Sequence, residues 1–423
     1  MAFSIPFGVQ KISFSLPDSC HVQEIKPRSS SAILSVKNAL IDILDHPTDC
    51  PALKNLVSAE DRIAIICDDH TRPTPIGGLL DSLLDLFLGL GISKRHIEVH
   101  VAYGLHPPMK KDELVSRFGK EIISSFSICH HDAHKKETLA FLGKTASETP
   151  VYVNRGVVDA DFRIGIGNIS LSKEAGYGGG AKVLMPGVCG AETIDGSHGK
   201  VRFHPNQIGC VSGNPIREEI EEVGRMARLD FIINTVLNGD DEICHLVAGD
   251  PLGAFREGLR IFNQVYQFNV EKPFDWCLAG SSPYDFEFYQ ANKAISAASL
   301  GVKDGGTIVL VSPCHKGISA FPYFDEMITS GRDFACWQEA LGKPDCPHKV
   351  AGEICLSLRY LQDVRNISVG MVSDGISKDK IAEMGLKPYA DVDEAVADGL
   401  ERYGMNARVG ILPKAPMTLL DVL

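Results

Sequence analysis

A glycine-rich stretch at residues 176–188 holds the densest group of residues with possible chemistry. Four of its first five residues are glycine, so its backbone can pass close to a flat or phosphorylated ligand and leave its amides free to donate. These glycines include Gly178, Gly179 and Gly180, and Lys182 follows them as a nucleophilic amine or a fixed cation. The stretch predicts a ligand-binding loop, and the alternative is a tight turn that binds nothing.

The residues around the lysine exclude two familiar nucleotide-binding motifs. A Walker A loop needs glycine before its lysine and serine or threonine after it, whereas Lys182 lies between Ala181 and Val183. The stretch does not match the dinucleotide-binding fingerprint either. It therefore indicates a different nucleotide-like ligand or a covalently modified lysine, and the motif leaves both open.

A second polar group follows the apolar run at 62–67, which is typical of a strand buried on both faces. This group consists of Asp69, His70, Thr71 and Arg72. Because ligands bind at the carboxyl ends of strands in open α/β sheets, we expect the group to lie at a binding site. Arg72 offers a two-pronged donor for phosphate or carboxylate, and an internal ion pair with Asp69 is the alternative.

His106 occupies the equivalent place after the next predicted strand, at 97–101. It lies between Gly104 and Pro107, where the chain turns sharply, and we expect its imidazole to face a cleft. The alternative is a solvated surface histidine.

A third set of polar residues, Tyr289, Gln290 and Lys293, lies on a helix predicted at 286–300. Gln290 and Lys293 are three residues apart and share one helix face, where an amide and an ammonium suit a carboxylate substrate. An ordinary solvated helix face is the alternative.

The run of cysteine, histidine and aspartate at 129–134 resembles a metal site in composition only. Adjacent residues on a strand point to opposite faces, so these side chains could not all converge on one ion. We predict no metal site from this run.

Alternating apolar and amphipathic runs predict the fold. Predicted strands at 62–67, 97–101, 151–154, 162–166 and 231–237 alternate with helices at 76–90, 111–118, 215–229 and 252–267. After a predicted linker at 269–273, strands at 276–279, 307–311, 367–372 and 408–412 alternate with helices at 286–300, 323–329, 351–361, 378–384 and 392–403. This order predicts two α/β domains with mainly parallel sheets and an active-site cleft between them. We place the N-terminal, ligand-binding catalytic domain at 1–270, beginning with a hairpin near 11–16, and the domain that adds substrate contacts at 271–423.

Charge and hydropathy narrow the choice of partners. The net charge is −12, and no basic block is present, which argues against binding to nucleic acid or to an anionic membrane. No apolar run reaches the roughly 18 residues of a membrane span, and the first 20 residues lack a signal peptide's pattern. We expect a cytoplasmic protein that acts on small molecules.

Together these motifs resemble the lactate racemase family of nickel-dependent hydroxy acid racemases and epimerases. The resembling residues are spread over most of the chain: 69–73, 104–107, 176–186 with His198, and Tyr289-Gln290 with Lys293. The glycine-rich stretch with its lysine and later histidine is the most specific of them.

The resemblance implies a cofactor, the nickel-pincer nucleotide, which is a pyridinium mononucleotide with two sulfur-bearing arms. Lys182 would be its covalent attachment point, and His198, sixteen residues later as in the family, would be the protein's nickel ligand. Residues 69–72 and the glycines would help to hold the cofactor, and Tyr289, Gln290 and Lys293 would face the substrate. Cofactor-synthesis enzymes would be partners.

The resemblance also implies racemisation by transfer of hydride to and from the cofactor, with two histidines as general bases. His106 matches one base. The second family histidine lies ten residues before the lysine, where this chain has Ser172 followed by Lys173. Serine is a poor base, so either Lys173 or another residue of the cleft would take the role, or the role would be lost. The substrate would then be a 2-hydroxy acid other than lactate. The alternatives are a non-catalytic nucleotide- or hydroxyacid-binding protein and a dehydrogenase or hydro-lyase.

Overall fold

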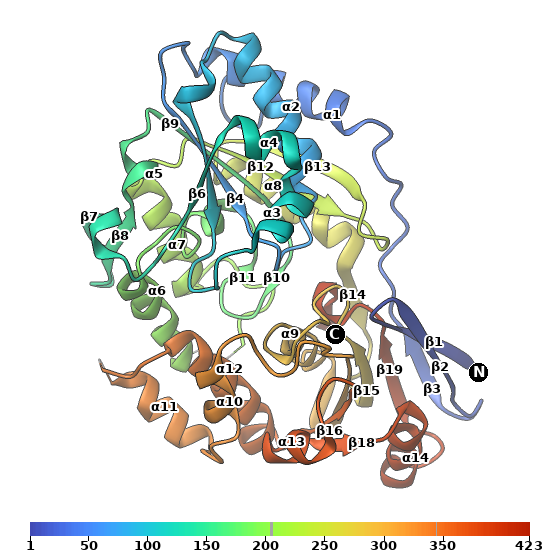
Figure 1. Cartoon of the computed structure of the whole chain (residues 1–423). Helices are drawn as coiled ribbons and strands as arrows, with labels where there is room; N and C mark the ends of the chain where they lie inside the picture. Colours follow the sequence, from blue (N-terminus) through green and yellow to red (C-terminus); the bar gives the residue numbers. More distant parts are fainter. Residues whose placement is uncertain (204–205, 344) are drawn as a thin grey trace.

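Two six-stranded sheets form the framework of the protein (Figure 1). The structure is a computed structural model that describes residues 1–203, 206–343 and 345–423. The first sheet has the order β13-β12-β9-β4-β5-β6, and the second has the order β18-β17-β16-β15-β19-β3. The prediction of an α/β fold with mainly parallel sheets is confirmed, because β13 against β12 is the one antiparallel pair of neighbours in the two described sheets.

The first sheet consists of β4 (Ile63–Asp68), β5 (Ile97–Ala102), β6 (Ser127–His130), β9 (Phe162–Asn168), β12 (Phe231–Leu237) and β13 (Ile243–Gly249). Successive side chains of a strand point to opposite faces. Ile65 therefore packs in one core with α1 (Val36–Asp45) and α2 (Ile76–Gly89). Ile66 packs in the other core with α7 (Pro215–Met226) and α8 (Gly253–Tyr266).

Shorter elements complete the first half of the chain. These are α3 (Lys111–Phe118), α4 (Lys120–Ser125), β7 (Leu139–Lys144), β8 (Pro150–Asn154), α5 (Arg155–Asp159), β10 (Leu171–Ser172), β11 (Gly176–Tyr177) and α6 (Ala191–His198). The antiparallel pair β10-β11 follows directly after β9. The glycine-rich stretch continues from β11 into the turn Gly180–Val183, which contacts β4, β9 and β12 of the sheet.

The second sheet is parallel throughout and is covered on both faces. Its strands are β3 (His21–Glu24), β15 (Phe274–Gly280), β16 (Val302–Val311), β17 (Ser368–Val372), β18 (Lys387–Tyr389) and β19 (Arg408–Leu412). The helices are α9 (Phe288–Ala298), α10 (Pro322–Ile328), α11 (Phe334–Gly342), α12 (Lys349–Arg359), α13 (Lys378–Glu383) and α14 (Val392–Tyr403). Residues of α9 and α12 belong to the same apolar cluster as those of α7 and α8, which therefore extends across both halves, and those of α14 belong to another cluster.

The chain crosses between the halves in a way that the sequence did not predict. The hairpin of β1 (Ala2–Phe7) and β2 (Gln10–Ser15) forms as expected, but β3 then pairs with β19 of the second sheet. Figure 1 shows this N-terminal segment beside the C-terminal one. A division at residue 270 therefore does not account for the start of the chain. The predicted linker at 269–273 is also partly a strand, because β14 (Gln267–Val270) pairs with β20 (Leu419–Val422).

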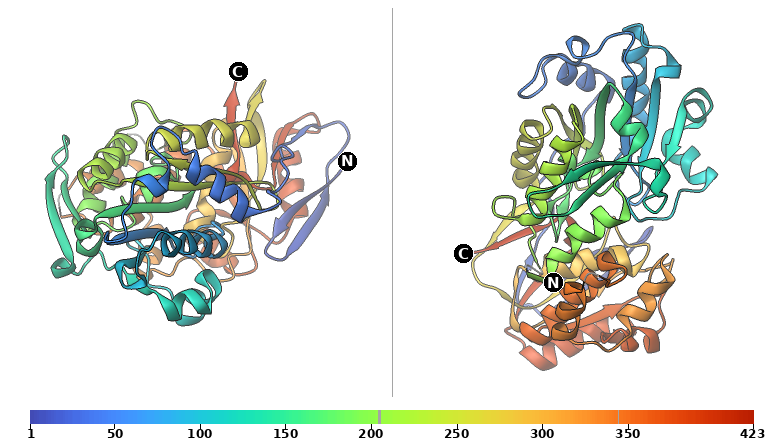
Figure 2. Two further views of the ribbon diagram at one scale, coloured as in Figure 1. Left: turned by 90° about the horizontal axis from the view of Figure 1, so that it is seen from above. Right: turned by 90° about the vertical axis from the view of Figure 1, so that its left-hand side faces the viewer.

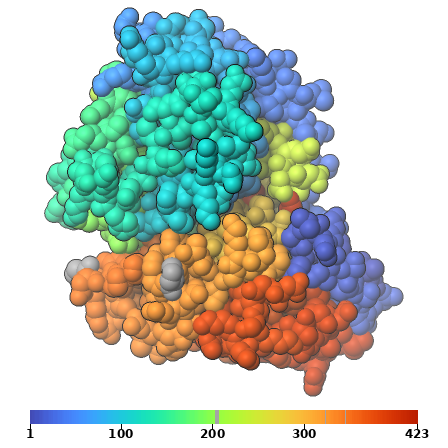
Figure 3. Space-filling view, viewed as in Figure 1, coloured from blue at the N-terminus to red at the C-terminus, as the bar shows by residue number. Residues whose placement is uncertain are grey.

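The two halves stack on each other, with the first sheet and its helices above the second in the view of Figure 1. Figure 2 shows the same arrangement after a quarter turn, and Figure 3 shows that the halves meet along a band across the molecule. Within the described ranges, no helix has both the length and the apolar content needed to cross a membrane.

Candidate active site

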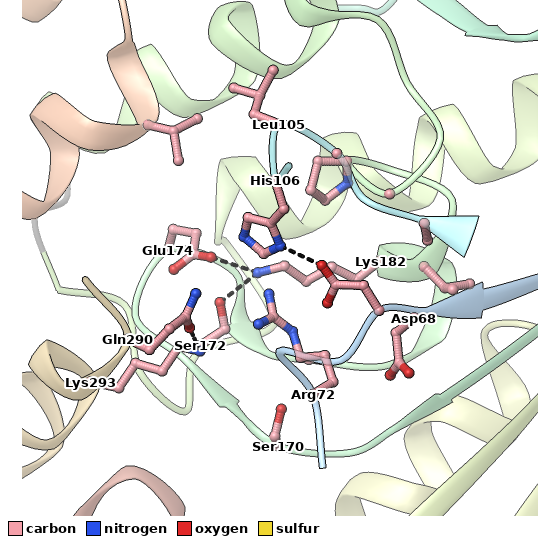
Figure 4. Close-up of a pocket in the computed structure, with 18 of the residues that line it drawn as sticks. Asp68, Arg72, Leu105, His106, Ser170, Ser172, Glu174, Lys182, Gln290 and Lys293 are labelled. Carbon is pink, nitrogen blue, oxygen red and sulfur yellow. Dashed lines mark hydrogen bonds and ion pairs between the residues drawn. The ribbon is translucent and has the colours of Figure 1, made fainter. Parts of the chain in front are cut away.

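A pocket of about 180 Å³ lies between the two halves and collects most of the predicted site residues. From the first half it is lined by His106, Ser172, Lys173, Lys182 and His198, and from the second by Tyr284, Tyr289, Gln290, Lys293 and Glu353. Figure 4 shows the Lys182 amine surrounded by His106, Glu174, Ser172 and Arg72, with Gln290 and Lys293 approaching from the other half. The predicted cleft between two α/β units is therefore present.

Steric limits explain the glycines that precede the lysine. Gly179 has φ +86°, a left-handed conformation, and a Cβ there would lie 2.7 Å from Ile169 Cδ1. Gly178 passes so close to Ser170 that a Cβ would lie 2.5 Å from its Oγ. Gly178 and Gly179 line the pocket, whereas the Gly180 amide donates to Asn234 Oδ1 at 2.8 Å. Gly180 thus holds the loop in place.

Arg217 of α7 holds the same loop in place through hydrogen bonds to its backbone. Its guanidinium donates to the carbonyl oxygens of Ala175 (3.2 Å), Tyr177 and Gly179 (3.4 Å). The side chain is fully buried and lies over the ring of Phe255. The sequence does not reveal this role of Arg217, since a single arginine on an amphipathic helix gives no sign of a partner 40 residues away.

Lys182 lies in a short 3₁₀ turn, Gly180–Val183, and its amine is held by two acceptors. The Nζ atom donates to Ser172 Oγ at 2.8 Å and to Glu174 Oε1 at 2.6 Å. Burial lowers the pKa of Lys182, although the charge of Glu174 opposes this effect. Burial alone would raise the pKa of Glu174, but the charges of Lys182 and His198 outweigh it and hold that pKa well below its usual range. A lowered amine pKa favours a nucleophilic lysine.

Asp69 orients His106. His106 Nδ1 lies 2.7 Å from Asp69 Oδ2, and the Thr71 hydroxyl donates to Asp69 Oδ1 at 2.5 Å. Asp69 is 1% exposed. Burial alone would raise its pKa, but the charge and hydrogen bond of His106 and the charge of Arg72 bring the pKa below its usual range. The carboxylate favours the tautomer with hydrogen on Nδ1 and leaves Nε2 to accept a proton.

The structure separates His70 from its neighbours in sequence. Arg72 lines the pocket between the halves, and Asp69 and Thr71 support His106. His70 instead lines a different pocket beside α3, with Nε2 4.0 Å from Glu113 Oε1. Residues 69–72 form a turn, in which neighbouring side chains point in different directions, so a polar run could not show which of its members reach the site.

On the second half, α9 presents a polar cluster to the pocket. Lys293 Nζ donates to Gln290 Oε1 at 2.7 Å and lies 3.9 Å from the centre of the Tyr284 ring. Burial, together with the charge of Arg72, lowers the pKa of Lys293 well below its usual range. The face predicted for Gln290 and Lys293 is therefore enclosed in the pocket.

Lys173 and Glu353 connect the halves on the far side of Ser172. Lys173 Nζ lies 3.2 Å from Glu353 Oε1, and the two residues are 8% and 3% exposed. Nothing in the sequence near Lys173 indicated Glu353, which comes from α12, 180 positions later. His198 ends α6 and also lines the pocket, with Nδ1 2.9 Å from the Ile194 carbonyl oxygen.

The side chains of the polar run at 129–134 have different partners and do not form one cluster. Cys129 faces Glu98 and His100 on neighbouring β5, with the three potential ligand atoms within 4.8 Å of one another. His130 contacts Tyr103, and His131 contacts the Cys189 carbonyl oxygen. A run of adjacent residues in the sequence does not show which side chains of the neighbouring strand lie beside it.

Comparisons with known proteins identify the family. Residues 7–209 match the lactate racemase N-terminal domain, and residues 277–417 match the lactate racemase C-terminal domain. The lactate racemase of Thermoanaerobacterium thermosaccharolyticum is 26% identical over 97% of this chain and 96% of its own length. That of Lactiplantibacillus plantarum is 27% identical over 98% of each.

A solved structure shows the same fold over the whole chain. The lactate racemase apoprotein from Thermoanaerobacterium thermosaccharolyticum superposes with a TM-score of 0.90 at 24% identity and covers 100% of both chains. With both domains matched, the chain belongs to the lactate racemase family. It is an isomerase of the racemase type, as the motifs predicted.

Proposed function

We propose that the protein inverts C2 of a 2-hydroxy acid other than lactate, with the nickel-pincer nucleotide attached to Lys182. The observation that carries this proposal is the convergence of Lys182, His198 and His106 on one pocket between the halves. The enzymes that make the cofactor would be partners in the cytoplasm.

The chemistry of the residues fits this cofactor. The Lys182 amine is buried and has a lowered pKa, as a nucleophile that forms a covalent link requires. His198 Nδ1 is engaged by a backbone carbonyl, which orients the ring and leaves Nε2 to bind nickel. Arg72 provides donors for a phosphate, and Gly178 and Gly179 allow close approach of the backbone.

The protein's own groups would bind the substrate and move its hydroxyl proton. When bound, the cofactor supplies an acceptor for the hydrogen of C2 as hydride. His106 Nε2 takes the hydroxyl proton, and Asp69 stabilises the resulting imidazolium. Lys293 and Gln290 bind the substrate carboxylate, and the buried Tyr289 helps to exclude water.

Ser172 supports a substrate other than lactate. A histidine is expected at this position from the family, and Ser172, which lines the pocket, is smaller and is not a base at neutral pH. The enclosed cations and carboxylates from both halves suit an acid with further polar groups.

Expression together with the cofactor-synthesis enzymes tests the proposal. We expect intact-mass analysis to find a cofactor-sized adduct and one equivalent of nickel, and Lys182→Arg to lose the adduct. Lys136→Arg, at an exposed lysine, is the matched control. A wild-type protein without adduct and nickel would refute the proposal.

The loaded protein is then incubated with single enantiomers of lactate, malate and 2-hydroxyglutarate and with the sugar acids erythronate and threonate. We expect inversion of an acid other than lactate, followed by chiral chromatography, and its loss in His106→Ala. Ser172 in place of a base also favours a second candidate, a protein that binds a hydroxy acid without turnover. Binding to the loaded protein with no inversion would support that candidate.

A further inference from the structure

Racemisation by the proposed route needs a second group that exchanges a proton with the substrate hydroxyl. Ser172, at the expected position, is poorly suited to this task. Its Oγ already accepts hydrogen bonds from Lys182 Nζ at 2.8 Å and from the Ala175 amide at 3.2 Å. A serine hydroxyl is also a weak base at neutral pH.

Glu353 of α12 has the features that Ser172 lacks. Its carboxylate lines the pocket from the second half and is held at Oε1 by Lys173, 3.2 Å away. Its other oxygen, Oε2, is buried and has no hydrogen-bond partner among the described residues. An unpaired buried carboxylate oxygen destabilises the fold, so a native protein that retains one requires an explanation from function.

We propose that Glu353 is the second proton acceptor and donor of the reaction, that it acts through Oε2, and that Lys173 positions it. The inference rests on the proposed function. It assigns one proton-transferring group to each half of the molecule, His106 to the first and Glu353 to the second.

The charges around Glu353 are compatible with this role. Burial raises the pKa of Glu353, Lys173 and His198 oppose the rise, and Glu174 adds to it. A carboxyl with a raised pKa transfers protons more effectively near neutral pH than an ordinary one. Glu174 is the competing carboxylate: its Oε1 accepts a hydrogen bond from the free Lys182 amine, and attachment of the cofactor to Lys182 would remove that ammonium, so Glu174→Gln is included in the test.

The step balances in atoms and electrons. The hydroxyl proton passes to Glu353 Oε2, and the electron pair of the broken O–H bond forms the second bond between oxygen and C2. The hydrogen of C2 leaves with its electron pair to the acceptor that the cofactor supplies. The keto acid then turns its other face to the acceptor and the hydride returns to C2, so that the electron pair of the C=O π bond moves to the oxygen, which takes a proton from protonated His106. The opposite enantiomer uses the two groups in the reverse order, and exchange with solvent restores them.

The test measures the reaction of each enantiomer of the substrate separately. Loaded enzyme is mixed with one enantiomer at a time of the acid that the wild type inverts, and the absorbance of the cofactor is recorded in a single turnover. In Glu353→Gln we expect the change to be about 100-fold slower or more with one enantiomer and nearly unchanged with the other. His106→Ala should show the opposite preference. Glu339→Gln, at an exposed glutamate of the neighbouring helix α11, is the matched control.

The position of Lys173 is tested without the cofactor. In the apoprotein, Glu353→Gln leaves the Lys173 ammonium buried without its partner, so we expect a lower midpoint of thermal unfolding. Adding Lys173→Met should restore part of the loss, because the two changes are coupled. In the loaded enzyme, Lys173→Arg should retain more of the enantiomer-specific rate than Lys173→Met.

Three results would overturn the inference. Equal slowing of both enantiomers by Glu353→Gln would make Glu353 structural, and unchanged rates with both would remove it from the reaction. The enantiomer-specific loss in Glu174→Gln instead would assign the role to Glu174. Failure of the wild-type adduct to form, or of any acid to be inverted, would refute the proposed function itself.

Discussion

At the scale of single residues, Asp69 determines the orientation and the tautomer of the His106 ring. Asp69→Asn would keep the size of the side chain but would no longer require hydrogen on Nδ1, so the wrong tautomer of His106 would be populated. We expect inversion of the substrate to fall by about 100-fold or more, as for other histidines that lose an orienting carboxylate. Chiral chromatography of the loaded enzyme measures the rate. Asp112→Asn, at an exposed residue of α3, serves as the control, and an unchanged rate in Asp69→Asn would contradict the assignment.

A second prediction at this scale concerns the pH at which Lys182 becomes reactive. Burial lowers the pKa of Lys182, and the charge of Glu174 partly restores it. Glu174→Gln removes the restoring charge, so the pKa should fall further and the neutral amine should appear at lower pH. Acetylation of the apoprotein at a series of pH values, read by peptide mass spectrometry, should show the Lys182 midpoint moving to lower pH. The exposed Lys37 of α1 is the control, whose extent of acetylation should be the same in both proteins, and a shift of Lys182 to higher pH would contradict the expected effect of Glu174.

The site residues that the sequence revealed are those whose setting is local. Lys182 directly follows its glycines, so the sequence shows the loop and the lysine as one motif. His106 follows a predicted strand within a few residues, so its place at the edge of the sheet can also be predicted. Glu353 and Lys173 meet only after the two halves fold against each other. No local pattern encodes such a contact, which is why the second proton-transferring group remained open at the level of sequence.

At the scale of elements, α7 acts as a support for the glycine-rich stretch. Arg217→Lys would replace a planar donor that reaches three carbonyl oxygens by an ammonium that cannot match that geometry. We expect the apoprotein to lose about 2–3 kcal/mol of unfolding free energy, because buried acceptors lose a charged donor. Urea unfolding measures this loss, and intact mass should show less adduct on Lys182. Arg225→Lys, at an exposed arginine of the same helix, is the control, and a full adduct with unchanged stability would contradict this role.

Elements with a strong period were predictable, and those defined by pairing were not. The spacing of the leucines in α2 predicts a helix, and the apolar runs of β4 and β12 predict buried strands. The structure confirms these three elements. The missed strand β13 alternates less clearly and is fixed by its antiparallel pairing with β12. The partner of β3 lies almost 400 residues away, so its sheet could not be read from its own residues.

At the scale of the whole molecule, the N-terminal hairpin belongs to the core of the second half. Phe14 of β2 is 4% exposed and lies in one apolar cluster with Trp276 and Leu278 of β15. The first half of the chain forms its own sheet, and its apolar core on the α1 and α2 side contains no residue of this hairpin among those described. The α1 and α2 side of the first half should therefore respond less to a change in the hairpin than the sheet of the second half.

Phe14→Ala tests this organisation. Truncation of a buried phenylalanine destabilises a core by about 3–5 kcal/mol through lost burial and the cavity left behind. In hydrogen exchange followed by mass spectrometry, peptides from β15 and β19 should exchange faster, whereas those from β4 and β9 should keep their protection. Val9→Ala, at the fully exposed tip of the hairpin, should change neither set. Equal acceleration in both sheets would mean that the halves open as one unit, and that a pocket between them could not open by movement of one half alone.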